Sequence, residues 1–325
     1  MVKFISSLDG KRVLVTGAAG FIGSNITDYL LNIGAYVIGI DNLYNGKLEN
    51  ISTALKNENF KFYKADIRDL SFLLQICESI DIIYHQAAFT SVPESIKMPY
   101  LCNDVNINGT FNILECARKH DIKSLIFAST AAVYGDNLNL PWKEIMNPIP
   151  ISPYGASKLA CEKYLYTYYK IYGLNTVILR YMNVYGPKQD VSPYSGVISK
   201  WLGRFKRSED LIIYGDGEQQ RDFIYIKDII EANILASTTK NIGGEVFNIG
   251  VGSNITINEL ANIMKEMWGN NTIKIIYSDP RVGDIKEGSA DNSKARSGLK
   301  FTPKYDIKTG LKDYIYWYKS NNSSN

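Results

Sequence analysis

The feature that most constrains the fold of this chain is a glycine-rich turn near the N-terminus. The turn follows a short apolar run, residues 11–16, and opens a helical pattern. A second apolar run, residues 36–40, comes next and ends at Asp41. A strand, a turn, a helix and a second strand with short connections form the opening unit of a parallel, doubly wound sheet. The glycines of the turn stand at intervals of three, at Gly17, Gly20 and Gly23.

The alternation of strands and helices continues through the first half of the chain. Further apolar runs end at Lys64, Gln86, Ala128 and Arg180, and a helical stretch separates each from the next. Continuous apolar strands suit a sheet that is covered on both faces. After Arg180, prolines and glycines interrupt the pattern, and short strands replace the regular alternation, at residues 211–214, 246–249 and 273–277.

We therefore predict an α/β fold with two domains. Residues 1–186 form a Rossmann-type doubly wound parallel sheet, to which a segment at about residues 222–238 returns. Residues 187–325 are mainly a smaller mixed α/β domain for the substrate. The Asn- and Ser-rich tail, residues 320–325, is predicted to be disordered.

Composition excludes several classes of protein. The 325 residues carry a net charge of +3 with both signs interspersed, which gives no basic tract for nucleic acid. No run approaches the roughly 18 apolar residues of a membrane span, and none resembles a secretion signal. The four cysteines lack CxxC spacing, and only His85 and His120 could add imidazole ligands. We expect a soluble, cytoplasmic protein without a metal and without nucleic acid or membrane partners.

A tyrosine and a lysine four residues apart form the pattern most typical of catalysis. Tyr154 and Lys158 lie in an amphipathic stretch, residues 153–172, where this spacing puts both side chains on one helix face. The ammonium can lower the tyrosine pKa from about 10 toward neutrality, so that the phenol exchanges a proton with a sugar hydroxyl or carbonyl. Upstream, Ser129 and Thr130 end a strand, where ligands bind in open sheets. A helix cap or turn is an equally good interpretation of Thr130 alone.

The glycine turn predicts a dinucleotide cofactor. Glycines let the main chain approach a pyrophosphate, whose charge the helix N-terminus favours. Asp41 would accept hydrogen bonds from the adenosine ribose and repel a 2′-phosphate, which favours NAD over NADP. The alternative is a tight turn with a surface aspartate.

Three further sets of residues leave two interpretations open. Asp66 and Ile67 follow the third strand, where a carboxylate could meet the adenine amino group or cap the next helix. The small residues at 86–88 suit either a cofactor wall or helix packing. Arg221 and Arg281 lie in loop-like settings and could converge on a diphosphate or form surface ion pairs.

Motifs along nearly the whole chain, from Lys11 to about Trp317, give it a family resemblance. It resembles the extended short-chain dehydrogenases/reductases, and among them the UDP-galactose and UDP-N-acetylglucosamine 4-epimerases. The motifs are TGAAGFIG at 16–23, DNL at 41–43, ADIRD at 65–69, HQAA at 85–88, SVPESI at 91–96, STAAVYG at 129–135, SPYGASK at 152–158, RYMNVYGP at 180–187 and RDFIYI at 221–226.

The resemblance implies roles for individual residues. Tyr154 is the acid/base, Lys158 modifies its pKa and binds the nicotinamide ribose, and Thr130, beside Ser129, replaces the serine usual in the family. Implied cofactor contacts come from Gly17, Gly20, Phe21, Ile22, Asp41, Asn42, Asp66, Ile67, Gln86, Ala87, Ala88 and Asn106. Implied substrate contacts come from Ser91, Asn183, Val197, Tyr214, Arg221, Arg281 and Gly288.

The implied reaction is an NAD-dependent 4-epimerisation of a UDP-sugar through a 4-keto sugar. Dehydratases and decarboxylases of the superfamily carry an acid after the Thr or Ser, whereas Ala131 and Ala132 stand here. Gly288 matches a position that gates the sugar pocket, and its small size favours UDP-GlcNAc/UDP-GalNAc with some activity on UDP-Glc/UDP-Gal. Alternatives are an epimerase of UDP-glucose or UDP-glucuronate, or an NAD-binding regulator without catalysis. The family pairs two subunits through a four-helix bundle, so we expect a homodimer.

Overall fold

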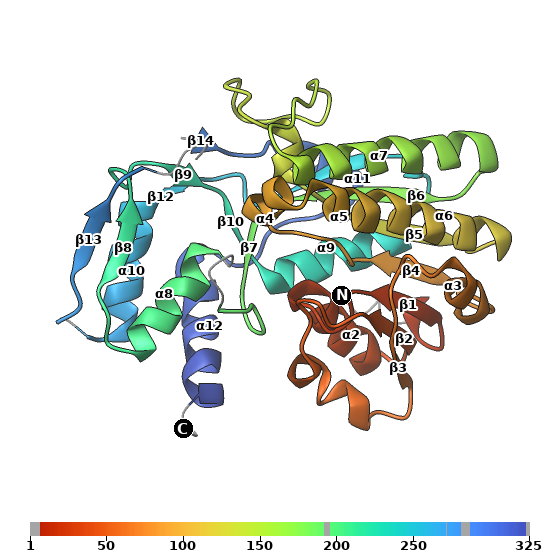
Figure 1. Ribbon diagram of the computed structural model, residues 1–325, viewed down its shortest axis with the longest axis horizontal. Helices are drawn as coiled ribbons and strands as arrows, with labels where there is room; N and C mark the ends of the chain where they lie inside the picture. Colours follow the sequence, from red (N-terminus) through yellow and green to blue (C-terminus); the bar gives the residue numbers. More distant parts are fainter. Residues whose placement is uncertain (1–6, 192–195, 271, 281–286, 323–325) are drawn as a thin grey trace.

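The structure is a computed structural model that describes residues 7–191, 196–270, 272–280 and 287–322. A seven-stranded sheet forms its centre. The strands are β1 (Arg12–Thr16), β2 (Tyr36–Asp41), β3 (Phe60–Lys64), β4 (Ile82–His85), β5 (Ser124–Thr130), β6 (Thr176–Tyr181) and β11 (Val246–Ile249). They run in the order β11-β6-β5-β4-β1-β2-β3, and every neighbouring pair is parallel (Figure 1). The predicted Rossmann-type α/β fold is confirmed.

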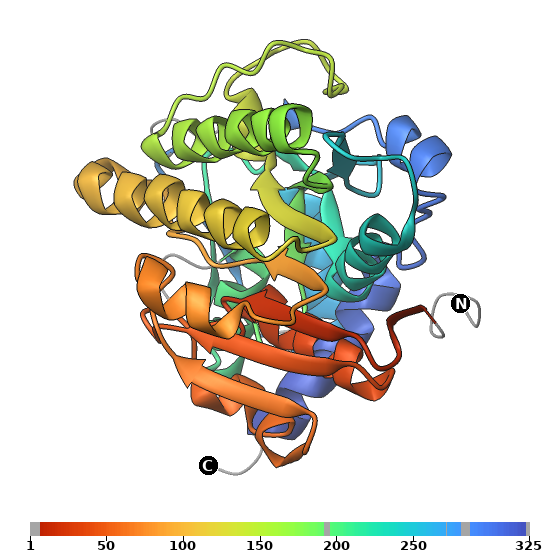
Figure 2. The ribbon, with the colours of Figure 1, turned by 90° about the vertical axis from the view of Figure 1, so that its right-hand side faces the viewer.

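Helices cover both faces of this sheet. In Figure 2 the sheet separates α6 and α7 from α9. Strands β4 and β6 are buried along their whole length, as expected for strands covered on both sides. The helical segments of this part are α2 (Phe21–Asn32), η1 (Leu48–Ile51), η2 (Ala54–Lys56), α3 (Leu70–Ile76), α4 (Val92–Lys97), α5 (Pro99–Asn103), η3 (Asp104–Asn108), α6 (Gly109–Lys119), η4 (Ala131–Tyr134), α7 (Pro153–Tyr172) and α9 (Ile226–Thr238).

The long helix α7 begins and ends at clear sequence signals. Ser152 is the N-cap, and its side chain accepts a hydrogen bond from the Gly155 N–H. Pro153 occupies the first helical position, where the missing N–H costs nothing. Gly173 ends the helix in the left-handed conformation at φ +70°. The cap therefore fixes Tyr154 in the first turn of α7.

The smaller domain contains both parallel and antiparallel pairs. Strand β8 pairs with β13 in parallel, while β9 pairs with β12 in antiparallel and with β14 in parallel. Strands β7 and β10 form a separate parallel pair between the two domains. The elements are β7 (Asn183–Tyr185), α8 (Val197–Lys206), β8 (Leu211–Tyr214), β9 (Gln220–Arg221), β10 (Phe223–Tyr225), β12 (Ile255–Thr256), α10 (Ile257–Trp268), β13 (Ile275–Ser278), β14 (Glu287–Gly288), α11 (Ser293–Gly298) and α12 (Ile307–Asn322).

Two sequence predictions about the second half are wrong. Residues 246–249, predicted in the smaller domain, form β11 at the edge of the central sheet beside β6. Residues 320–322, predicted to be disordered, continue helix α12, and the rest of that tail lies outside the described residues. For β11, tertiary packing outweighs the local composition on which the prediction rested. Residues 320 and 321 are exposed and extend a helix whose preceding turns are partly buried, and Asn321 Nδ2 donates to the Trp317 carbonyl oxygen at 2.9 Å.

Candidate active site

A cleft of about 590 Å³, here called the cofactor cleft, lies over the glycine turn. Gly17 has φ +67°, and a Cβ there would lie 2.8 Å from the main-chain N of Ala87. A Cβ at Gly23 would lie 2.1 Å from the Gly17 carbonyl oxygen. Glycine is required at both positions, and its small size lets the turn and the N-terminus of α2 face the cleft. The predicted cofactor residues that line the cleft are Gly17, Gly20, Phe21, Ile22, Asp41, Asn42, Ile67, Gln86, Ala87 and Ala88.

Asp41 lies buried at the end of β2. Its Oδ2 accepts a hydrogen bond from the Ala19 N–H at 3.0 Å, and its Oδ1 accepts one from the Leu43 N–H at 2.8 Å. Burial raises the pKa of the carboxyl, while these main-chain donors oppose the rise. Each oxygen retains a lone pair, so the group can still accept hydrogen bonds from hydroxyls. The alternative of an exposed surface aspartate is therefore wrong.

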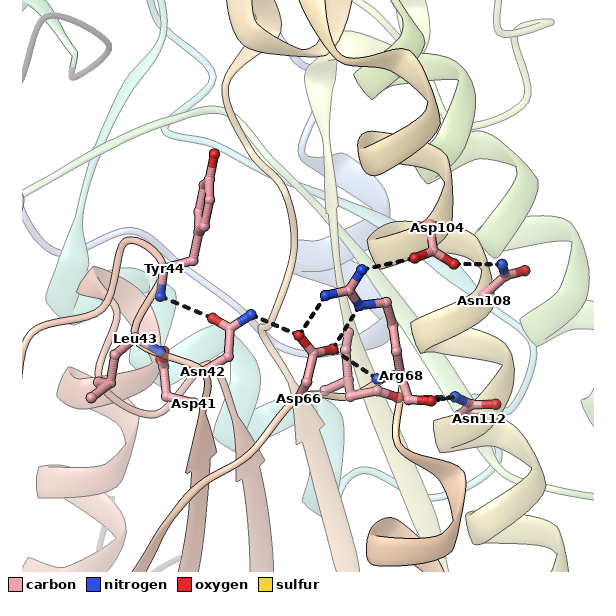
Figure 3. Close-up of polar contacts among 10 residues, drawn as sticks. Asp41, Asn42, Leu43, Tyr44, Asp66, Arg68, Asp104, Asn108 and Asn112 are labelled. Atoms are coloured by element: carbon pink, nitrogen blue, oxygen red, sulfur yellow. Dashed lines mark hydrogen bonds and ion pairs between the residues drawn. The ribbon is translucent and has the colours of Figure 1, made fainter.

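Asp66 does not line the cleft but lies in a hydrogen-bond network beside it (Figure 3). Asn42 Nδ2 and Arg68 Nη2 each donate to its Oδ2 at 2.9 Å. The hydrogen bonds from Arg68 lower the pKa of Asp66 to about 2. The N-cap of α3 is Asp69, whose side chain accepts from the Phe72 N–H, so the helix-cap interpretation of Asp66 is wrong.

Arg68 is a site residue that the sequence reasoning missed. It lines the cofactor cleft, and its Nη1 donates to Asp104 Oδ2 at 2.8 Å. The same guanidinium thus joins the loop after β3 to η3 (Figure 3). The available signal was its position in the ADIRD motif, next to Asp66.

Asn106 is buried and holds the loop that follows β4, and it does not line either cleft. Its Oδ1 accepts from the Phe89 N–H at 2.7 Å, and its Nδ2 donates to the Phe89 carbonyl at 3.1 Å. The Nδ2 also donates to Ser157 Oγ at 2.8 Å. The side chain is thus engaged in holding the loop, and its direct contact with the cofactor stays a prediction.

His85 supports the floor of the cleft. Its Nδ1 lies 2.7 Å from Thr16 Oγ1, and its Nε2 lies 3.0 Å from Thr110 Oγ1. Burial lowers the pKa of His85 to about 3, so the ring is neutral. Thr16 Oγ1 also accepts from the Ala87 N–H at 3.1 Å and so fixes the cleft wall. Sequence analysis considered His85 only as an imidazole ligand and as part of the HQAA motif, and did not predict this supporting role.

Tyr154 lines a second cavity of about 870 Å³, here called the substrate cleft, together with Thr130. A Cβ at Gly155 would lie 2.6 Å from the Ala132 carbonyl oxygen, so glycine permits α7 to approach the end of β5. Burial raises the pKa of Tyr154 to about 12, and a hydrogen bond with the Thr130 side chain opposes the rise. The phenol and the Thr130 hydroxyl therefore lie in the same cleft.

Lys158 is buried behind this pair. Its Nζ donates to the Ala128 carbonyl oxygen at 2.8 Å and lies 4.5 Å from the centroid of the Phe127 ring. Burial lowers the pKa of Lys158 to about 8. In the protein alone the ammonium is directed at Ala128 and burial raises the Tyr154 pKa, so the lowering of that pKa by Lys158 stays a prediction.

Ser129 points away from the substrate cleft. Its hydroxyl donates to Glu162 Oε1 at 2.5 Å, and Glu162 is paired with Arg180. Both charged side chains are almost completely buried, with 2% and 3% of their surfaces exposed. Ser129 is thus a positioning residue rather than the predicted catalytic one, and it ties β5 to α7 and β6.

The substrate cleft gathers residues from separate elements and is continuous with the cofactor cleft. Thr90, Gln189 and Gly196 line both clefts. Ser91, predicted to contact substrate, lines the cofactor cleft instead and caps α4. Arg281 lies outside the described residues. The predicted residues that line the substrate cleft are Thr130, Tyr154, Asn183, Val197, Tyr214 and Arg221. Missed residues on the same wall include Tyr185, Lys200 and Arg204.

Gly288 is buried and lies opposite Arg221 in the β14–β9 pair. A Cβ there would lie 3.0 Å from the indole ring of Trp142. Trp142 in turn stacks on Tyr134, with ring centroids 5.1 Å apart. Gly288 is not among the residues that line either cleft, and an aromatic ring occupies the space beside it, so its role as an open gate stays a prediction.

The cofactor cleft fits a dinucleotide on three observations. The glycine turn leaves room that Cβ atoms would fill, the N-terminus of α2 favours an anion, and Asp41 offers free acceptor positions. The NAD dependent epimerase/dehydratase family model matches residues 13–250. The chain belongs to this family.

Relatives in the family match almost the whole chain. A putative UDP-glucose 4-epimerase from Methanocaldococcus jannaschii is 42% identical, covering 95% of this chain and 99% of the relative. A UDP-glucuronate 4-epimerase from Thermodesulfobacterium geofontis is 37% identical, covering 95% and 96%. The structure of UDP-N-acetylglucosamine 4-epimerase from Methanobrevibacter ruminantium M1, in complex with UDP-N-acetylmuramic acid, is 41% identical with a TM-score of 0.92, covering 96% and 99%.

Membership of the epimerase/dehydratase family confirms the predicted resemblance, NAD as the cofactor and an isomerase as the class of enzyme. Among the described residues, no helix combines the length and apolar character needed to cross a membrane. The same part of the chain contains no group of three or more His, Cys, Asp or Glu arranged to hold a metal. The four cysteines are buried and free.

Proposed function

We propose that this family member is a UDP-sugar 4-epimerase that interconverts UDP-GlcNAc and UDP-GalNAc, with some activity on UDP-Glc and UDP-Gal. The observation that carries the proposal is the pairing of Tyr154 with Thr130 in a cleft that opens into the cofactor cleft, with Lys158 buried behind it. The named relatives support the coarser function, NAD-dependent 4-epimerisation of a UDP-sugar. Support for the N-acetyl sugar comes from the solved N-acetylglucosamine epimerase.

Tyr154 is the proposed acid/base. Its phenolate would take the proton of the sugar 4-hydroxyl, and the same phenol would return a proton to that oxygen after the sugar has turned over, so no proton is consumed. Thr130 holds the phenol by a hydrogen bond and orients it. When bound, NAD accepts the hydride from C4 and returns it, and its positively charged ring favours the phenolate. This charge would offset the burial that raises the Tyr154 pKa in the protein alone.

The residues beside Thr130 favour epimerisation over elimination. Ala131 and Ala132 follow it and carry no acid or base. Neither side chain can therefore remove a proton from a second carbon of the sugar, as an elimination requires. Because these two side chains are apolar, Tyr154 is the proton-transfer group of the proposed reaction.

UDP-glucuronate is the alternative substrate, because one relative acts on it by name. A uronate carboxylate needs a cationic or polar partner near the sugar ring. Thr90 and Gly196 line both clefts, and Val197 lines the substrate cleft, but none of the three carries a charge. UDP-glucose alone is the second alternative.

The test is proton NMR of the purified protein with UDP-GlcNAc, UDP-Glc and UDP-GlcA in separate tubes, without added cofactor. We expect the UDP-GalNAc anomeric signal to rise to equilibrium in the first tube. Turnover of UDP-Glc alone would keep the reaction and overturn the N-acetyl preference. Turnover of UDP-GlcA alone would establish the uronate alternative. Silence in all three, repeated with added NAD, would contradict the proposal.

We also propose that two subunits associate through α6 and α7. Phe111 and Tyr164 project from these helices, 41% and 43% exposed, and contact each other edge to face with centroids 5.6 Å apart. Tyr172, at the end of α7, is 54% exposed. Exposed aromatic side chains on adjacent helices are typical of a buried interface. A sedimentation-equilibrium mass of one chain would contradict the dimer.

A further inference from the structure

Residues 187–190, here called the strap, lead from β7 toward the smaller domain along the cofactor cleft. They follow β7 and precede α8, yet Lys188, Gln189 and Asp190 line the cofactor cleft. In Figure 1 the green chain after β7 lies between the two domains. The strap is thus part of the cofactor site, although its sequence lies far from the glycine turn.

Lys188 fastens the strap to the opposite wall of the cleft. Its ammonium pairs with Asp28 of α2 and donates to the Asn50 carbonyl oxygen at 2.6 Å. Only 16% of the Lys188 side chain is exposed, so solvent screens this contact weakly. Asn25, also in α2, donates from Nδ2 to the Pro187 carbonyl oxygen at 3.1 Å. Two chain segments, α2 and η1, therefore hold two successive strap residues.

A second anchor lies at the other end of the strap. Lys47 pairs with Asp190, and both side chains are partly exposed. The Lys47 N–H donates to the Ala19 carbonyl oxygen at 3.0 Å, and Asn50 Nδ2 donates to the same oxygen at 2.9 Å. Ala19 belongs to the glycine turn. The strap is therefore held by residues that themselves rest on the turn beneath the cofactor.

The main chain at Lys188 is in an unfavourable conformation for lysine. The Gln189 N–H donates to the Gly186 carbonyl oxygen at 3.3 Å, which closes a four-residue turn with Pro187 in its second position. Lys188, in the third position, has φ +69°, where such turns favour glycine or asparagine. Lysine is unfavourable in this left-handed conformation, and the contacts that its ammonium makes across the cleft offset that cost.

We propose that the strap retains NAD in its cleft during turnover, with Lys188 and the Lys47–Asp190 pair as its two anchors. This inference rests on the proposed function. In an epimerisation the hydride that leaves C4 must return to the same sugar, so loss of the cofactor between the two transfers would strand the sugar as a 4-ketone. A cleft closed by a fastened segment prevents that loss.

The experiment measures release of NAD, without any UDP-sugar. The protein is loaded with radiolabelled NAD, diluted into excess unlabelled NAD, and sampled for retained label. Lys188→Asn removes the ammonium while keeping a residue that the turn favours, so the fold is preserved and thermal unfolding checks it. We expect release at least about tenfold faster, the effect of losing one charged hydrogen bond. Lys123→Asn is the matched control, since it removes a similar pair with Asp81 at the opposite ends of the strands.

Two aspartate variants separate the strap from simple charge attraction. Asp28→Asn and Asp190→Asn each remove a negative charge, which by charge alone would slow the release of an anionic dinucleotide. The strap predicts faster release in both. Release unchanged within twofold in Lys188→Asn, or slower release in the two aspartate variants, would overturn the inference. Because no sugar is present, the rate of NAD release can be interpreted even if the protein does not catalyse the proposed reaction.

Discussion

The cofactor cleft and the substrate cleft are built in different ways. Most lining of the cofactor cleft comes from turns that directly follow strands β1, β2, β3 and β4, and hydrogen bonds join these strand ends to one another. The substrate cleft draws Thr130, Asn183 and Arg221 from elements about 50 and 40 residues apart. The ends of neighbouring strands therefore supply most of the first cleft, and separate elements of both domains supply the second.

The largest expected effect is the loss of catalysis on substitution of Tyr154, which tests the substrate cleft without altering the cofactor cleft. Tyr154→Phe removes the proton-transfer group and leaves the walls of both clefts in place. We expect kcat to fall by about 10³-fold, within the range for loss of a general acid/base. NMR turnover assays measure the loss, and retained NAD and UDP binding serve as controls. A variant with more than a tenth of the wild-type rate would contradict the assigned role.

A clash beneath the glycine turn should damage the cofactor cleft alone. Gly17→Ala adds a Cβ 2.8 Å from the Ala87 N, at φ +67°. Gly10→Ala is the matched control, because Gly10 has φ +68° with nothing within 4 Å of its Cβ position. We expect the control to lose about 1 kcal/mol in free energy of unfolding, because alanine is strained at positive φ. Gly17→Ala should lose about 2 kcal/mol more, because its methyl group also overpacks against Ala87.

Denaturant unfolding measures the free energy of unfolding of both glycine variants, and calorimetric titration measures their affinities for NAD and UDP. We expect Gly17→Ala to bind NAD at least about tenfold more weakly, since about 1.4 kcal/mol of misfit suffices. UDP affinity should be unchanged. Equal losses of NAD and UDP affinity would show that a change at the glycine turn disturbs both clefts, and would contradict this prediction.

The reach of sequence reasoning follows the same division. Gly17, Asp41, Tyr154 and Thr130 could be predicted because each stands in a short motif at the end of a strand or the start of a helix that can be recognised along the chain. The contact of His85 with Thr16 joins residues 69 positions apart, and no local pattern announces it. The small size of Gly288 can be read from the sequence, whereas the ring of Trp142 that lies beside it comes from another loop. Spacing predicts which residues share an element, and packing decides what lies opposite them.

The smallest expected effect is a pH dependence on the substrate side. Asp222, next to Arg221, is buried and accepts hydrogen bonds from the Val251 and Gly252 N–H groups at 2.9 and 3.0 Å. Burial raises the pKa of Asp222 from 3.8 to about 6. Between these values the native protein holds more protons than the unfolded chain, so the Asp222 contribution to the free energy of unfolding falls as the pH rises.

Asp222→Asn removes this titration. Relative to the wild type, we expect the variant to gain about 2 kcal/mol in free energy of unfolding between pH 4 and pH 7. Urea unfolding at the two pH values measures the difference. Asp228, whose pKa is also raised to about 6, is common to both proteins and cancels. A relative stability that does not change with pH would contradict the raised pKa.

The pairing of β11 with β6 has a consequence for dividing the chain. Residues 246–249 lie in register with residues 178–181 and cover what would otherwise be the outer edge of the central sheet. A fragment that stopped at residue 186 would expose the N–H and C=O groups of a buried, apolar strand. Such edges pair with other chains and aggregate. The half of the molecule that binds the cofactor is thus completed by the other half, and truncation for expression or screening must keep both.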